Sequence, residues 1–322
     1  MSDTKKRHQA KGEPMNFDSI LQKNKIKTYA VLCVYIAIFA LIGLLVDIIR
    51  IDAPSLEYGF YALLSLREFP LITTIAALVA CAVIWYSLSR FDVIMLKGDE
   101  YELIPESGHL APLQAFVRNA FDDVLSRAGF SHAPRLYLIH APYMNAFASG
   151  WSEQNSLVAI TTELAKNLDE RELKAVLAHE VSHIRHGDIR LTMSVGILSN
   201  ILLLICNSAA WLFMGDRRND GAQKARSILL VLQFVLPLLT MWLQMFLSRS
   251  REYMADAGSA YLMHNPDPII SALKKISNNY TSHDFSQVDN NPTRKAAYIF
   301  EMGDMFSTHP SLENRIKSLY GR

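Results

Sequence analysis

Residues 169–188 read DERELKAVLAHEVSHIRHGD, a stretch whose pattern is helical throughout. Asp169 followed three residues later by Glu172 resembles a capping box, so a helix is expected to begin there. Apolar residues recur along it at spacings of three and four and predict a buried stripe, made by Leu173, Val176, Leu177, Val181 and Ile184. Side chains that flank this stripe can be packed on one side and open on the other.

Two histidines flank the stripe in an H-E-x-x-H array at residues 179–183. Positions i and i+4 of a helix share a face, so the imidazoles of His179 and His183 converge on one point that suits a zinc ion. Glu180 cannot bind the same ion from that face, but it can take a proton from a water that the metal activates. The chemistry indicated is peptide hydrolysis. Two solvated helix histidines are the alternative that this motif alone leaves open.

A catalytic zinc normally has three protein ligands and one open position, so a further ligand is expected elsewhere. The metzincin continuation needs Gly at position 186 and His at position 189, where this chain has His186 and Ile189. Glu252, on a later helical stretch, is the better candidate because Asp256 lies four residues on, on the same face. Asp256 can accept the second N–H of a ligand histidine. An exposed helix end, with Arg251 and Glu252 as solvated charges, is the alternative.

Other possible ligands have simpler interpretations. His186 is interpreted as a surface residue beside Arg185 and Asp188, because a catalytic zinc must keep one position open. His140 and Glu163 are interpreted as structural. The cysteines lack C-x-x-C spacing and lie in apolar stretches, which indicates packing rather than disulfides or metal binding: Cys33, Cys81 and Cys206.

The composition indicates a membrane protein. Half of the 322 residues are apolar, and the mean hydropathy is +0.12. Four stretches approach the ~20 residues that cross a bilayer as helix, and Asp47 is their only charge: 28–49, 70–89, 191–214 and 228–247. Buried helices of a large soluble core are the alternative. The formal net charge of +1 gives no case for nucleic acid as a partner.

The distribution of basic residues predicts which side of the membrane each segment occupies. The segment before the first span is rich in lysine and arginine, whereas the first loop carries only Arg50 and Arg67, so the basic side is expected to be cytoplasmic. Basic residues around 215–227 weaken this reading of the second loop. The predicted domains are a disordered cytoplasmic tail (1–27), two transmembrane helices (28–90), the first part of a protease domain (91–190), a transmembrane hairpin (191–247) and the second part (248–322).

The segment between the second and third predicted spans combines a helix with a small sheet. Residues 99–130 carry an amphipathic helical pattern that ends at Gly129. Residues 135–139 and 156–160 are expected to be strands, and 145–150 is a third extended candidate.

Several segments together carry a family resemblance. The chain is similar to the HtpX family of membrane-bound zinc endopeptidases, relatives of the CAAX prenyl endopeptidases. The segments that carry it are IHAP (139–142), NAFA (145–148), VLAHEVSH (176–183), REYMADAGSA (251–260) and THPSLENRI (308–316). Val181, His186 and the long N-terminal tail depart from the usual pattern, and none of them touches an expected ligand.

The resemblance implies a mainly α membrane protein with four transmembrane helices and a cytoplasmic α+β, gluzincin-type zinc protease domain. It implies Glu252 as the third ligand of one Zn²⁺ per subunit and Glu180 as the catalytic glutamate. It further implies cleavage of misfolded or unassembled membrane proteins in the inner membrane of a bacterium, as a response to envelope or heat stress. The expected partners are polypeptide substrates and the lipid bilayer.

Two further roles are hypotheses for residues outside the expected ligand set. His309 and Arg315 are the best cations to stabilise the tetrahedral oxyanion of the transition state, although His309 as a helix cap is an equal alternative. Residues Asn145, Ala146, Phe147 and Ala148, if they form a sheet edge, are expected to bind the substrate backbone as an added strand.

Three rival functions fit these residues less well than a protease that acts outside the bilayer. A non-catalytic scaffold has no use for the carboxylate of Glu180. An intramembrane protease needs its H-E-x-x-H inside an apolar span, whereas charged residues surround the motif here. A zinc transporter needs ligands within the spans, and none of the four contains them.

Overall fold

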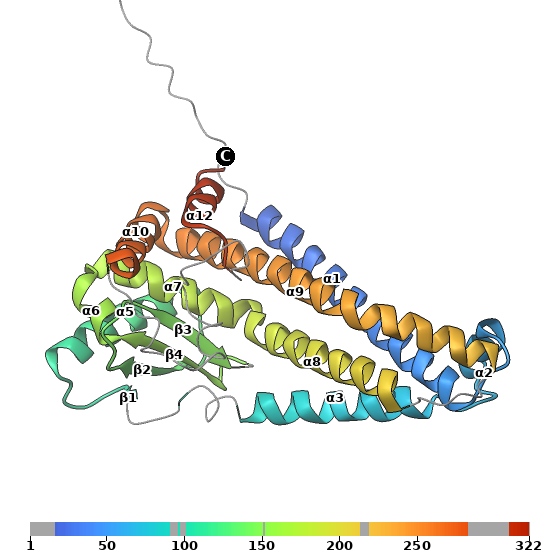
Figure 1. Cartoon of the computed structure of the whole chain (residues 1–322). Coiled ribbons are helices and arrows are strands. Elements are labelled where there is room, and N and C mark those ends of the chain that lie inside the picture. Colours follow the sequence, from blue (N-terminus) through green and yellow to red (C-terminus); the bar gives the residue numbers. More distant parts are fainter. Residues whose placement is uncertain are drawn as a thin grey trace, which may run out of the picture.

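The computed structural model describes residues 17–90, 96, 101–150, 152–212, 219–282 and 309–321. Figure 1 shows an elongated molecule in which long helices occupy one end and a small sheet with shorter helices occupies the other. One helix, α9, runs through both ends.

The helical end contains the four predicted spans. Its helices are α1 (Phe17–Arg50), α2 (Leu56–Leu64), α3 (Leu71–Ser89), α8 (Asp188–Leu212) and α9 (Asp220–Met263). Buried apolar residues of α1, α8 and α9 form its core, among them Tyr35, Ile42, Leu202 and Leu236. The predicted tail was partly wrong, because α1 already begins at Phe17, so residues 17–27 are helical. Residues 1–16 lie outside the described part of the chain.

Among the described residues, two helices are long and apolar enough to cross a membrane. These are Tyr29–Arg50, with a mean hydropathy of 2.8, and the helix Asp220–Met263, with a mean hydropathy of 2.0 in its most apolar window. Leu71–Tyr86 and Leu198–Ser208 are shorter apolar helices within the described part of the chain. Four crossings therefore remain a prediction.

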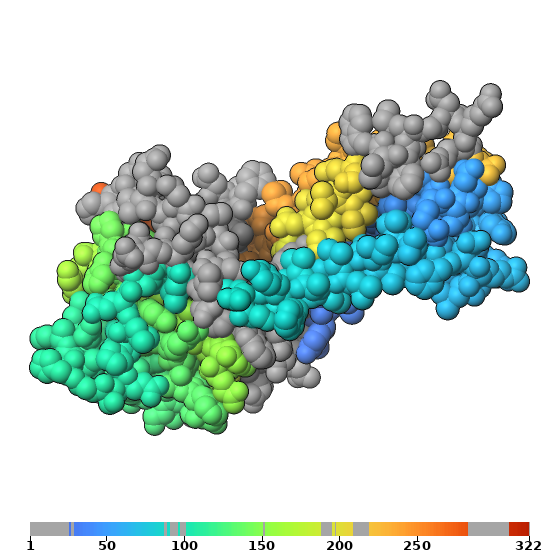
Figure 2. Space-filling model, turned by 90° about the horizontal axis from the view of Figure 1, so that it is seen from below, coloured from blue at the N-terminus to red at the C-terminus, as the bar shows by residue number. Residues whose placement is uncertain are grey.

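The surface of these helices is apolar. Only 22% of the most apolar window of α9 is buried, and large side chains such as Leu78 and Trp85 on α3 and Phe234 and Leu238 on α9 are exposed. Figure 2, seen from below, shows α3 in cyan lying along the outside of the molecule. Contact with lipid accounts for such a surface, whereas the core helices of a soluble protein would be covered.

Asp47, the one charge within the predicted spans, is fully buried in the structure. Its carboxylate accepts the backbone N–H groups of Ile72 at 3.0 Å and Thr73 at 2.9 Å. Arg50 donates to it from the next turn of α1 at 2.7 Å. Asp47 therefore satisfies the free amides at the N-terminus of α3 and joins two neighbouring helices.

The other end of the molecule is a four-stranded sheet covered by helices. Its strands are β1 (Tyr101–Ile104), β2 (Arg135–Ile139), β3 (Ala146–Gly150) and β4 (Ser156–Thr161), in the order β1-β2-β4-β3. β2 and β4 are parallel, and the two other pairs are antiparallel. The helices are α5 (Pro112–Ala128), α6 (Thr162–Asn167), α7 (Glu170–His186), α10 (Asp267–Ser282) and α12 (Leu312–Leu319).

The three predicted strands are confirmed as β2, β3 and β4, and the helix ending at Gly129 is confirmed as α5. The helical interpretation of residues 101–111 was wrong, because β1 occupies Tyr101–Ile104 and α5 begins only at Pro112, and residues 99 and 100 lie outside the described part of the chain. β1 has only four residues, and its partner β2 begins more than thirty residues later. The local sequence pattern therefore does not predict β1.

The capping box that starts α7 is confirmed. Oδ1 of Asp169 accepts the N–H groups of Arg171 and Glu172 at 2.9 Å, and Oε2 of Glu172 accepts the N–H of Asp169 at 2.9 Å. Glu172 also accepts hydrogen bonds from Ser271 and Lys275 of α10, each at 2.6 Å. The helix ends at Gly187, whose φ of 67° is left-handed. Both ends of the histidine-bearing helix are therefore fixed.

Candidate metal centre

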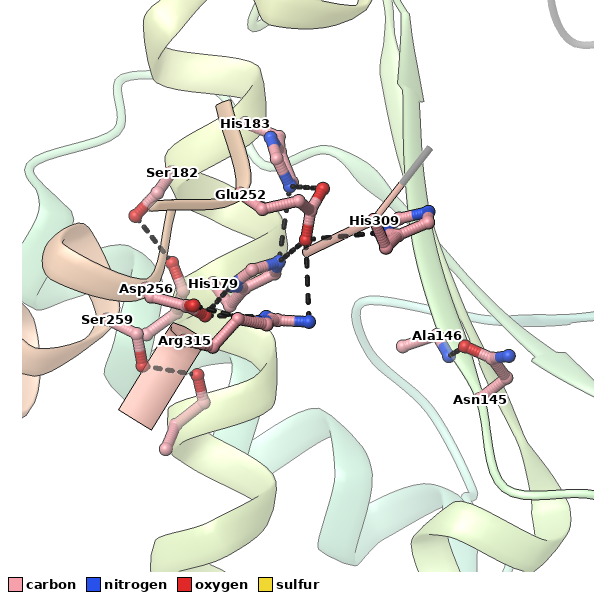
Figure 3. A network of polar contacts seen from close by, with 12 residues as sticks. Asn145, Ala146, His179, Ser182, His183, Glu252, Asp256, Ser259, His309 and Arg315 are labelled. Carbon is pink, nitrogen blue, oxygen red and sulfur yellow. Dashed lines mark hydrogen bonds and ion pairs between the residues drawn. The ribbon is translucent and has the colours of Figure 1, made fainter. Parts of the chain in front are cut away.

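The candidate site lies where α7 and α9 pack side by side (Figure 3). The Nε2 atoms of His179 and His183 are 3.2 Å apart. Oε2 of Glu252 lies 3.6 Å from the first of these atoms, and Oε1 lies 3.6 Å from the second. One ligand atom from each residue can be chosen so that all three lie within 4.8 Å of one another. A tetrahedral zinc with bonds of about 2.0–2.1 Å separates its ligand atoms by about 3.3 Å, so the donor set fits this ion.

The surroundings of the three side chains favour positive charge at their centre. His179 and Glu252 are buried. Burial alone lowers the pKa of His179, but its contacts with Asp256 and Glu252 outweigh this effect and raise the pKa to about 9. Because neighbouring carboxylates hold a positive charge on the imidazole, the same position stabilises a metal cation.

Asp256 approaches the far side of the ring of His179. Its Oδ1 lies 3.0 Å from Nδ1 of His179. A carboxylate at this distance favours a proton on Nδ1, so that a neutral ring beside a bound cation presents the lone pair of Nε2 toward Glu252 and His183. The structure therefore brings Asp256 to the position that its spacing from Glu252 predicts.

Arg315 and His309 both approach the carboxylate of Glu252. The guanidinium of Arg315 donates from Nε to Oδ2 of Asp256 at 2.8 Å and from Nη2 to Oδ1 at 2.5 Å. Its Nη1 lies 3.5 Å from Oε2 of Glu252. Nδ1 of His309 is also 3.5 Å from that oxygen. His309 is not the cap of the last helix, because Ser311 accepts the N–H of Asn314 and is the N-cap of α12.

Glu180 is buried beside the three candidate ligands and is not one of them. The amide of Ala148 in β3 approaches its carboxylate, but neither oxygen has a hydrogen-bond partner of good geometry among the described residues. Burial raises the pKa of Glu180 to about 8; the charge of His179 opposes this rise and that of Glu252 adds to it. A buried carboxyl with such a pKa can exchange a proton near neutral pH, as a general base must.

The segment predicted to bind substrate lies at the edge of the sheet. Asn145 directly precedes β3, and Ala146, Phe147 and Ala148 lie in it. Within the described residues, β3 pairs with β4 on one side and with no strand on the other. Ala146 and Ala148 belong to the core cluster shared with α7, whereas Phe147 packs on the opposite face of the sheet.

Sequence reasoning missed how closely α7 and α9 approach. A Cβ added to Gly258 of α9 would lie 2.3 Å from Oγ and 2.8 Å from Cβ of Ser182 in α7. Ser259 donates from Oγ to the carbonyl of Ala175 at 2.6 Å, which joins the two backbones. The residues from Ala255 to Ala260 are all small except Asp256, and this pattern could have indicated such a contact. This contact sets the distance between Glu252 and the two histidines.

Replacing Gly258 with Ala is expected to weaken zinc binding on the order of tenfold, because the added methyl group must push α9 away from α7. Competition with a chromogenic chelator measures this change. Gly196→Ala is the matched control, since a Cβ at Gly196 meets no atom within 4 Å. Adding Ser182→Gly to Gly258→Ala should recover much of the affinity. Equal zinc affinity in all three variants would contradict the role of this contact.

Comparison with known proteins identifies the family of this arrangement. The model of peptidase family M48 matches residues 112–322, which include every candidate site residue. The chain belongs to peptidase family M48. A Protease HtpX homolog of Helicobacter acinonychis (strain Sheeba) is 56% identical over 308 residues, covering 96% of this chain and 99% of that protein. A Protease HtpX homolog of Helicobacter pylori (strain Shi470) is 55% identical over 307 residues, covering 95% and 99%.

A solved structure supports the fold independently. Ste24p of S. mikatae superposes with a TM-score of 0.51 at 16% sequence identity, covering 94% of this chain and 67% of that one. At this identity the likeness shows the fold alone. The resemblance to the HtpX family is thus confirmed, and the chain has the fold of the M48 membrane metalloproteases.

Proposed function

We propose that this M48 protein is a zinc-dependent endopeptidase in which His179, His183 and Glu252 hold one Zn²⁺ per subunit. The observation that carries the proposal is the convergence of these three donors on one point beside the buried carboxyl of Glu180. A metal-binding scaffold explains the three donors, but it leaves that costly buried carboxyl without a purpose.

The mechanism assigns a separate task to each remaining side chain. When bound, zinc supplies a Lewis acid that polarises the substrate carbonyl and lowers the pKa of water. Glu180 takes a proton from the attacking water and passes it to the leaving amine nitrogen. Asp256 holds the proton on Nδ1 of His179 and fixes the orientation of the ring.

The two cations proposed for the transition state have different surroundings. The guanidinium of Arg315 is engaged by Asp256 and lies close to Glu252, so its proposed task is to hold these two carboxylates in place. This leaves His309 as the preferred candidate to stabilise the oxyanion from outside the ligand set.

We further propose that β3 binds the substrate as an added strand. Its backbone passes the carboxyl of Glu180 at Ala148, so a strand paired with this edge brings a peptide bond close to the proposed base. Recognition through backbone groups explains tolerance of many sequences, which a protease acting on misfolded proteins requires.

The length of α9 supports membrane proteins as the substrate class. The helix has 44 residues, or about 66 Å, roughly twice the thickness of the hydrocarbon core. Glu252 lies five residues beyond the predicted span 228–247, which corresponds to about 7.5 Å along the axis. The centre therefore belongs near the bilayer surface, where it can reach segments that leave the membrane. The basic residues before the first span favour the cytoplasmic face, and we propose the bacterial inner membrane and a role in quality control under stress.

The reaction class is tested by incubating the detergent-purified protein and zinc with casein, with and without a chelator. We expect fragments only in the zinc sample, and their return when zinc is added to the chelated protein. Bound zinc without fragments would favour the scaffold, and fragments that persist after chelation would exclude the proposed mechanism.

A further inference from the structure

The segment between α1 and α3 carries an exposed apolar surface. Within α2, Tyr58, Tyr61 and Leu64 follow one another at a spacing of three and share one side of the helix. Leu66 and Phe69 continue this surface toward α3, and each of the five side chains is at least 47% exposed. We refer to these five residues as the α2 patch. Figure 1 shows α2 at the end of the helical part that is farthest from the sheet. Apolar side chains gathered in this way mark a surface that contacts a partner.

The opposite side of α2 is packed against the rest of the molecule. Gly59, Ala62 and Leu63 are buried. A Cβ added to Gly59 would lie 2.7 Å from Cγ1 of Ile48 in α1, so the two helices are in close contact. Glu57 is the only charged residue of α2. A helix that borders water presents a polar face to it, whereas α2 is apolar on both sides. The outer side of α2 therefore fits an apolar neighbour better than water.

The ends of three long helices meet beside α2. A Cβ added to Gly221 would lie 2.5 Å from the carbonyl carbon of Ser55, the N-cap of α2, so the first turn of α9 packs against the start of α2. Arg50, the last residue of α1, donates to the carbonyl of Phe69 at 2.6 Å, two residues before α3 begins. The last turn of α1 and the first turns of α3 and α9 therefore lie at the level of α2.

The length of α9 relates this level to the metal centre. Gly221 and Glu252 both lie on α9, 31 residues apart, which corresponds to about 46 Å along the helix axis. A bilayer including its headgroup regions is about 40–45 Å thick. With the metal centre near one surface of the bilayer, α2 lies at the level of the opposite headgroup region. The exposed surface also continues beyond Phe69 into Leu71 and Ile75 of α3, the helix whose apolar outside contacts lipid.

We propose that α2 is an interfacial helix whose patch binds the boundary between headgroups and acyl chains, on the membrane face opposite the metal centre. Tyr58 and Tyr61 suit this boundary because each ring is apolar and ends in a hydroxyl that can stay in contact with water. The guanidinium carbon of Arg67 lies 4.9 Å from the centroid of the Tyr61 ring, which places a positive charge beside the patch. Lipid phosphates complement this charge.

The test measures the surroundings of nitroxide labels on the full-length protein in vesicles of phosphatidylethanolamine and phosphatidylglycerol. The labels are attached to Tyr61→Cys or Leu64→Cys in a chain whose native cysteines are replaced with Ala: Cys33, Cys81 and Cys206. Electron paramagnetic resonance compares collisions with oxygen, which concentrates in lipid, and with a nickel chelate, which stays in water. We expect both labels to favour oxygen, at a depth of about 5–10 Å below the headgroup surface.

Two matched positions calibrate the measurement. Leu103 in β1 is 52% exposed and Tyr61 is 53% exposed, so their labels differ in their surroundings rather than in their coverage by this chain. The label on Leu103→Cys should favour the nickel chelate, because the sheet lies outside the bilayer. Leu78 of α3, which is 66% exposed, is the reference in lipid, and the label on Leu78→Cys should favour oxygen more strongly than that on Tyr61→Cys.

The remaining outcomes contradict the proposal. Labels on α2 that meet the nickel chelate as often as the label on Leu103→Cys would place the patch in water. Labels that meet neither reagent would show that protein covers it, either a second copy of this chain or another partner. Tyr58→Cys repeats the measurement on the same side of α2 should a labelled protein unfold at a lower temperature than its unlabelled parent. The measurement does not depend on catalysis, so either contradicting result leaves the proposed protease function untouched.

Discussion

Replacing Glu180 with Gln should abolish proteolysis while zinc remains bound. The amide has the shape of the carboxyl group, and the three proposed ligands are untouched, so the metal centre is expected to assemble. An amide cannot accept a proton from water, and loss of a general base costs about 10²- to 10⁴-fold in kcat. The rate of casein cleavage and the zinc content of the same sample together measure the effect.

Glu170→Gln is the matched control for this experiment. Glu170 lies in the first turn of the same helix, is exposed, and pairs with Lys174 at 2.7 Å. Its loss should leave the cleavage rate close to that of the unmodified protein. Retained turnover in Glu180→Gln would rule out the proposed base. Loss of zinc from this variant would instead indicate that Glu180 supports the ligands.

The parts of the site that the sequence predicted are those set by local geometry. His179 and His183 meet because helical spacing places i and i+4 on one face, and the capping box at Asp169 defined where that helix begins. Glu252 and Asp256 share one helix in the same way, so a second short-range pattern paired them. The contact between the two helices is long-range. The candidate third ligand was therefore found by excluding the metzincin continuation and by the spacing of four residues between Glu252 and Asp256, and not from the contact itself.

The parts that the sequence did not predict depend on tertiary contacts. Arg315 was considered as a transition-state cation, whereas the structure engages it with Asp256 from a helix 59 residues away. The hydrogen bond between Asn145 and Tyr280 joins residues that are 135 positions apart in the chain. Nothing in the sequence around either residue predicts this pairing. Strand β1 was not predicted for the same reason, because its pairing partner, β2, lies far along the chain.

The second large effect is expected at Arg315, where replacement with Met should strongly destabilise the fold. Its side chain is 1% exposed and lies against two buried carboxylates, those of Asp256 and Glu252. Removing one member of a buried charge network costs about 3–5 kcal/mol, because the two buried carboxylates lose the guanidinium charge that offsets their own and cannot regain it from water. Thermal unfolding of the detergent-solubilised protein, with and without zinc, measures the loss.

Zinc and two control variants distinguish this effect from a general loss of packing. Added zinc should recover part of the stability of Arg315→Met, because the cation neutralises Glu252, but not all of it, because Asp256 remains without its guanidinium. Arg315→Lys keeps the charge and loses the two-pronged contact, so it should fall between the Met variant and the unmodified protein. Arg127→Met breaks a partly exposed pair with Asp123 and should cost at most about 1 kcal/mol. Equal unfolding temperatures for Arg315→Met and Arg127→Met would show that the buried network is not what holds α9 and α12 together.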